Sequence, residues 1–110
     1  MAMNDEDELT LTNILNESKQ TKVDLQEFVK TSDDRIEEIN DLIDQINDLK
    51  KENENYPDLL NDLMKYKSAL LQIKTDIESE KKSMIGEMSK MDQIISAVEK
   101  AIKWNTGDIF

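Results

Sequence analysis

The chain of 110 residues is short enough for a single domain, and it combines only two Gly and one Pro with 35% charged side chains. This composition is typical of long helices and coiled coils, and it argues against a sheet-containing globule. A net charge of −11, with no His and no Cys, disfavours binding to nucleic acid phosphates and leaves the chain without disulfides, thiolates and the commonest general base.

The first eight residues form an acidic start. We expect residues 1–8 to be a flexible tail ahead of a helix that begins near residue 9. This start is too acidic for a signal peptide, and no apolar run approaches the roughly 18 residues that a membrane span needs. The expected location is therefore the cytoplasm or an assembled particle.

Residues 9–53 show apolar residues in alternating steps of four and three, which predicts the first arm of a helical hairpin. The expected seam residues are Leu11, Leu15, Ser18, Lys22, Leu25, Val29, Ser32, Ile36, Ile39, Ile43 and Ile46. With Phe28, Leu42 and Leu49 beside them, the stripe is wide enough for two neighbouring helices. Residues 31–34 resemble a capping box, which leaves open whether this arm is one helix or two.

Residues 54–57 are the expected turn, because Asn55 tolerates turn conformations and Pro57 suits the first position of a new helix. Folding there pairs residues whose numbers add up to about 112. The expected apolar pairs are Ile39 with Ile73, Leu42 with Leu70, Leu49 with Leu63, and Phe28 with Met84. The expected ion pairs are Arg35 with Glu80 and Lys22 with Glu87.

Residues 58–103 form the second arm of the predicted hairpin. Its expected seam runs through Leu59, Leu63, Tyr66, Leu70, Ile73, Ile77, Glu80 and Met84, and then through Met88, Met91, Ile95, Val98 and Ile102. The two consecutive steps of four around Met84 predict a stutter, a local unwinding of the coiled coil. Because Gly86 also weakens a helix, residues 83–90 are the expected soft segment.

The predicted fold is therefore all-α, a long antiparallel helical hairpin of the coiled-coil kind that completes a bundle by oligomerisation. Residues 1–62 carry 18 acidic against 6 basic side chains, and residues 63–110 carry 7 against 8. An acidic arm beside a nearly neutral one favours closure of the hairpin over pairing of two acidic arms. Residues 104–110 are expected to form a C-terminal tail.

Two surfaces are candidates for function. One is an acidic face with helical spacing, formed by Glu27, Asp34, Glu37, Asp41, Asp44, Asp48 and Glu52. It is either a solvated face or a mimic of a phosphate backbone, because carboxylates three or four residues apart are spaced about 4.5–6 Å along a helix. The other is a candidate partner-binding set formed by Met84, Met88, Met91, Trp104, Ile109 and Phe110. Its methionines either fill the core or line a recognition groove, and its C-terminal residues either cover the end of the bundle or dock in a partner.

The predicted hairpin can be compared with two known families. Near-equal arms resemble the small secreted helical hairpins of the WXG type, but Asn55-Tyr56-Pro57 replaces their Trp-x-Gly turn, so membership is not supported. Residues 35–46 and 80–104 are similar in pattern to acidic flagellar or type III export chaperones, which hold apolar client helices in a groove. The chain is assigned to neither family.

The expected function is that of a non-enzymatic assembly or adaptor protein that binds other proteins through coiled-coil contacts, as a homo-oligomer or a hetero-complex. No catalytic residues, cofactor or metal site are expected, because the chain lacks a phosphate-binding Gly-rich loop and a calcium-binding loop. Direct nucleic acid binding and membrane binding are not expected either. An acidic export or assembly chaperone and an acidic DNA-mimic inhibitor remain as alternatives.

Overall fold

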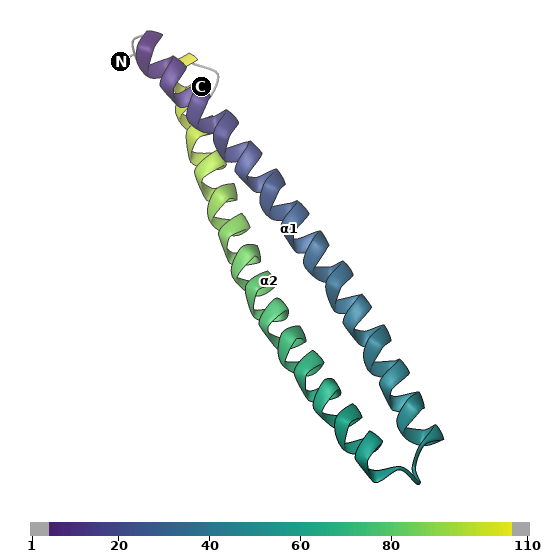
Figure 1. Cartoon of the computed structure of the whole chain (residues 1–110). Coiled ribbons are helices and arrows are strands. Elements are labelled where there is room, and N and C mark those ends of the chain that lie inside the picture. Colours follow the sequence, from purple (N-terminus) through teal and green to yellow (C-terminus); the bar gives the residue numbers. More distant parts are fainter. Residues whose placement is uncertain (1–4, 107–110) are drawn as a thin grey trace. The chain divides into compact units, whose positions relative to one another are not determined.

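Two long helices make up the fold: α1 spans Asp5–Glu52 and α2 spans Pro57–Thr106. The computed structural model describes residues 5–106, and the side chains of residues 5–104. The helices contribute to two compact units, unit 1 within Met1–Phe28 and Met84–Phe110 and unit 2 within Val29–Ser83. In each unit the segment of α1 runs antiparallel to the segment of α2 (Figure 1). The predicted all-α antiparallel hairpin is confirmed.

α1 begins at Asp5, ahead of the expected start near residue 9, and all four residues of its first turn are acidic. These carboxylates are favourable at the positive end of the helix dipole, as are Lys50 and Lys51 at its negative end. The helix continues without a break through residues 31–34. The first arm is therefore one helix, and no helix begins at the capping-box pattern.

The turn consists of residues 53–56 and lies in unit 2. The Tyr56 amide donates to the Asn53 carbonyl at 3.0 Å. The Asn53 side-chain amide donates to the Leu49 carbonyl at 2.8 Å. Asn53 therefore satisfies a carbonyl of the last turn of α1, which would otherwise lack an intrahelical partner.

α2 begins with Pro57, one residue ahead of the expected start at residue 58, because proline has no amide hydrogen to leave unsatisfied at the first position of a helix. The Tyr56 carbonyl accepts from the Leu60 amide at 3.0 Å and so starts the helix. At the other end α2 continues to Thr106, past the expected end at residue 103.

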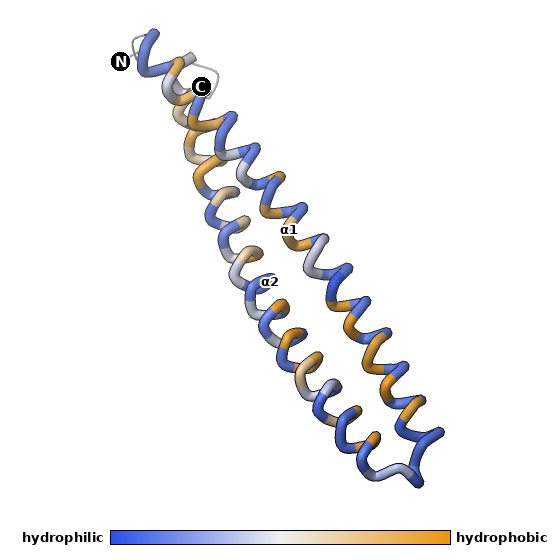
Figure 2. The backbone as a smooth tube through the Cα atoms, in the orientation of Figure 1, coloured by the Kyte–Doolittle hydropathy of each residue, from blue (hydrophilic) through white to orange (hydrophobic). Residues whose placement is uncertain are grey.

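The seam of α1 lies where the sequence places it. Every expected seam residue from Leu11 to Ile46 is buried or half-buried, whereas Phe28, Leu42 and Leu49 are exposed beside the seam. Polar and apolar residues accordingly alternate at short intervals along the helix (Figure 2). The alternation in steps of four and three is that of a coiled-coil helix.

The seam of α2 differs from the predicted one, and this is a correction. Its buried and half-buried residues in steps of three and four are Leu60, Leu63, Lys67, Leu70, Lys74, Ile77, Lys81, Met84, Met88, Met91, Ile95, Val98 and Ile102. Leu59, Tyr66, Ile73 and Glu80, which the sequence pattern placed in the seam, are exposed.

The predicted stutter is therefore absent. The steps of three and four continue without interruption through Met84, and α2 is helical throughout residues 83–90. Gly86 lies on the exposed side, and apart from the adjoining backbone of its own helix no described atom lies within 4 Å of where its Cβ would be. The glycine thus interrupts no packing, and the expectation of a soft segment has no support from the seam.

Candidate functional site

The lysines of α2 in unit 2 mark which face of the helix enters the seam. Lys67, Lys74 and Lys81 recur every seven residues and are all half-buried. A lysine can bury its aliphatic stem along an apolar surface while its ammonium group stays at the edge. In a coiled-coil repeat lettered a to g, the a and d positions face the other helix. These lysines occupy a positions, and Leu63, which is 6% exposed, occupies a d position.

Two of these lysines reach across to α1. Lys67 Nζ donates to Asn47 Oδ1 at 2.9 Å, and Lys81 forms an ion pair with Asp33. The third, Lys74, has its Nζ 4.0 Å from Oε1 of Glu78 on the same helix. Asn47 and Asp33 both occupy e positions, next to the α1 seam. We call this side of unit 2 the lysine flank, defined by Asp33, Asn47, Lys67 and Lys81.

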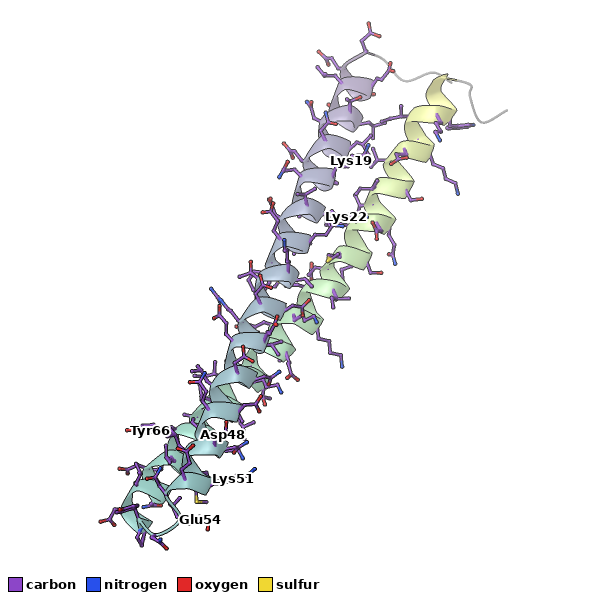
Figure 3. The ribbon with its side chains drawn as sticks, turned by 90° about the vertical axis from the view of Figure 1, so that its right-hand side faces the viewer. Lys19, Lys22, Asp48, Lys51, Glu54 and Tyr66 are labelled. Atoms are coloured by element: carbon purple, nitrogen blue, oxygen red, sulfur yellow. The ribbon has the colours of Figure 1, made fainter. Side chains whose placement is uncertain are left out.

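Unit 1 contains one contact of the same kind with the helices exchanged. Lys22 of the α1 seam pairs with Asp92 of α2 at 2.6 Å. Figure 3 shows the Lys22 side chain reaching from α1 toward α2. Asp92 again occupies an e position. In unit 1, as in unit 2, a seam lysine finds its acceptor at an e position of the other helix.

These contacts establish the register and correct the predicted one. The residue numbers of the pairs Lys22 with Asp92, Asp33 with Lys81, and Asn47 with Lys67 each add up to 114, and not to 112. Glu87, the expected partner of Lys22, instead has its Oε1 3.4 Å from Nζ of Lys90 on the same helix. Within the described residues the expected pair of Arg35 with Glu80 forms no ion pair, and both side chains are exposed.

The Lys22–Asp92 pair can be tested by charge exchange. Lys22→Glu is expected to destabilise the fold, because it places a carboxylate beside Asp92, and adding Asp92→Lys is expected to restore most of that loss. The side chains are 33% and 55% exposed, so the coupling should be modest, about 0–1 kcal/mol. Urea unfolding of the single and double variants measures it. Lys22→Glu combined with Glu87→Lys is the matched control, and stronger coupling there would support the register of 112.

The predicted partner-binding residues fall into three groups. Met84, Met88 and Met91 are half-buried in the seam of unit 1, where their flexible side chains fill space between the helices. Trp104 is exposed on α2. Ile109 and Phe110 lie outside the described residues. Binding of a partner by any of them stays a prediction.

The predicted acidic face is exposed: Glu27 in unit 1, and the remaining six residues on α1 in unit 2. Within the described residues none of the seven forms an ion pair with a lysine or arginine. Exposure fits a solvated face and a phosphate mimic equally, so these carboxylates alone do not distinguish the two.

The side of unit 2 opposite the lysine flank carries a surface that the sequence pattern missed. It consists of five exposed apolar residues, which we call the apolar flank: Leu42, Leu49, Leu59, Tyr66 and Ile73. All five occupy g positions. Reversing one helix also reverses the direction in which its positions run around the axis, so the g positions of two antiparallel helices lie on one side of the seam. In Figure 3, Tyr66 projects to the left of unit 2 and Lys51 to the right.

The sequence pattern assigned Leu59, Tyr66 and Ile73 to the seam, because an argument from hydrophobic periodicity prefers apolar residues over lysines as seam positions. The sequence does show that a second stripe exists, through a pair of lysines seven residues apart, Lys67 and Lys74, each directly after one of those apolar residues. Such a repeat marks a second stripe that competes for the seam.

A shallow depression lies beside the turn of unit 2. It is lined by Asn47, Lys50, Lys51, Glu54 and Leu60. Its lining residues come from the last turns of α1, the turn itself and the first turn of α2, so it lies at one end of the seam.

Comparisons with protein-family models, with curated proteins and with solved structures find no match to this chain. Neither helix, over the residues that the structure describes, contains a stretch long and apolar enough to cross a membrane. Over residues 5–106, the acidic side chains form no group that could hold a metal ion.

Proposed function

We propose that this protein is a non-enzymatic assembly or adaptor element that works by packing its helices against those of other proteins, including further copies of itself. The observation that supports the proposal is the amount of large apolar surface left uncovered in unit 2, where Tyr66 is 62% exposed and the rest of the apolar flank is also exposed. A large apolar side chain gains roughly 1.5–3 kcal/mol from complete burial. Association with another helix would recover part of that free energy.

The thinness of the seam supports the same proposal. Ile39 and Leu63 are the buried apolar residues of the part that the structure describes, and no large side chain there is fully buried. Two helices alone form one line of contact, whereas a bundle of three or four helices encloses a core. A third or fourth helix would therefore turn half-buried seam residues into buried ones.

We expect the isolated protein to sediment as more than one chain at micromolar concentration. Its melting temperature should also rise with protein concentration, because association stabilises only the folded state. Sedimentation equilibrium and thermal melts over a concentration series measure both. A monomeric mass with a sharp transition that does not depend on concentration would contradict self-association.

The export-chaperone and DNA-mimic alternatives remain proposals without a structural observation that favours them. The chaperone alternative shares the exposed apolar surface but needs a single client in a one-to-one complex. A stoichiometry measurement by light scattering on a purified complex distinguishes it from an assembly element. The DNA mimic would compete with DNA for a nucleic-acid-binding protein, and a competition assay over a salt series tests it.

A further inference from the structure

The apolar flank of unit 2 is bordered by acidic residues on both sides. The next positions outward from the g positions are the c positions, which carry Glu38, Gln45 and Glu52 on α1 and Asp62, Ala69 and Asp76 on α2. We call the four acidic residues among them the acidic rim. All four are exposed, and Asp76 accepts a hydrogen bond from the Gln72 side-chain amide at 3.0 Å. Within the described residues none of the four forms an ion pair.

The rim residues lie at corresponding places on the two helices. Glu38 and Glu52 are fourteen residues apart in α1, and Asp62 and Asp76 are fourteen residues apart in α2, which is about 21 Å along a helix. Glu52 and Asp62 both lie near the turn. The antiparallel register places Glu38 and Asp76 at the same level, at the other end of the flank. Each end of the apolar flank thus carries one carboxylate on each side.

From this arrangement we propose that the apolar flank binds an amphipathic helix of a different protein, whose apolar stripe is bordered by lysine or arginine on both sides. This proposal rests on the proposed function, which it makes specific. Apolar contact supplies the non-directional attraction, and the rim selects the sign of the partner's charge. The flank is about two heptads long, which matches a short docking helix.

Charge also argues against a second copy on this surface. Two apolar flanks packed face to face would bring two acidic rims together, and the acidic face residues Asp34, Asp41 and Asp48 lie just beyond the α1 side of the rim. Lys65 lies beyond the α2 side, one position further around the helix. Self-association would then use apolar positions outside the apolar flank.

Unit 1 lacks this combination. Its corresponding side carries the exposed residues Ile14, Phe28 and Ile94. Acidic residues border that side on α1, but Lys90 borders it on α2. A helix of either charge would therefore meet a like charge on one side. Selectivity for a basic partner is a property of unit 2.

The test uses the full chain and two synthetic helical peptides of about three heptads. They share a Leu and Ile stripe and differ in the residues that border it, which are Lys in one peptide and Glu in the other. Calorimetric titration at low salt is expected to give binding of the Lys peptide at least about tenfold tighter than the Glu peptide, since four exposed ion pairs each contribute modestly. Added salt should shrink the difference.

Two variants locate the binding site. Ile73 and Leu71 are 48% and 43% exposed on the same helix but lie on opposite sides of the seam. Ile73→Glu is expected to abolish binding of the Lys peptide, and Leu71→Glu is the matched control that should retain it. Circular dichroism checks that both variants remain helical. Unchanged binding in a helical Ile73 variant would overturn the proposal.

A charge-reversed protein tests the rim without changing the apolar residues. With Glu38, Glu52, Asp62 and Asp76 all changed to Lys, the preference is expected to switch to the Glu peptide.

Equal binding of both peptides to the original protein, or crosslinks between copies at Tyr66, would overturn the proposal. If the protein self-associates but binds neither peptide, this inference alone fails. If it is a monomer that binds neither, the proposed function fails as well.

Discussion

Ile39→Ala is expected to lower the free energy of unfolding by about 2–5 kcal/mol, the usual cost of truncating a buried isoleucine. Ile39 is 7% exposed, in the seam of unit 2. Removing its outer carbons forgoes their burial and leaves a gap that two helices can close only in part. Urea unfolding followed by circular dichroism, at one fixed protein concentration, measures the change.

Ile85→Ala provides the control for that result. The same truncation is made, but Ile85 is 49% exposed on α2, so the expected loss is well under that at Ile39. Similar losses at the two positions would contradict the seam as the structure describes it, since they would mean that Ile85 is as closely packed as Ile39.

Replacing the three seam lysines of unit 2 by isoleucine is expected to stabilise the protein and to loosen its register. Lys74 and Lys81 have side chains that are 29% and 31% exposed, so each isoleucine would bury apolar surface worth about 1–2 kcal/mol. The triple variant Lys67→Ile, Lys74→Ile, Lys81→Ile would also lose the contacts to Asn47 and Asp33. Polar residues at a positions specify register at a cost in stability.

Unfolding measurements and spin-label distances test the two halves of this prediction. The chain contains no cysteine, so nitroxide labels on cysteines introduced at the exposed residues Asp41 and Gln72 report the register without interference. The distance distribution should be narrow in the original sequence and broader in the triple variant. The exposed lysines Lys65 and Lys82, changed to isoleucine, are the control and should alter stability by about 0.5 kcal/mol or less each. A triple variant that is less stable, or equally narrow, would contradict the role assigned to the lysines.

The two flanks of unit 2 differ in the contacts that they make. The lysine flank holds the cross-helix contacts of Lys67 and Lys81 and so determines how the two helices are aligned. The apolar flank takes no part in these contacts and remains exposed. Because lysines occupy these seam positions of α2, Leu59, Tyr66 and Ile73 lie outside the seam and remain exposed.

The helical hairpin, its turn and the seam of the first arm follow from the amino-acid sequence. Gly and Pro are too few to interrupt long helices, Pro57 sets the start of α2, and the apolar residues of α1 keep one frame from Leu11 to Ile46. In that arm the half-buried Lys22 is the one lysine within the stripe, so the period leaves one choice of face.

The face of α2 and the register of the hairpin depend instead on how the helices pack. A stripe through Leu59, Tyr66 and Ile73 and a stripe through Leu60, Lys67 and Lys74 differ by one residue. Periodicity alone favours the more apolar of these two stripes, and that choice is wrong for α2.

The lysine side chain explains why periodicity selects the wrong stripe of α2. Its stem buries apolar surface that a hydropathy scale does not count, and its ammonium group needs an acceptor from the other helix. Asn47 and Asp33 supply acceptors only once α1 lies alongside in the register of 114. Because these acceptors are distant in sequence from the lysines, no local pattern in α2 could reveal which of its two stripes enters the seam.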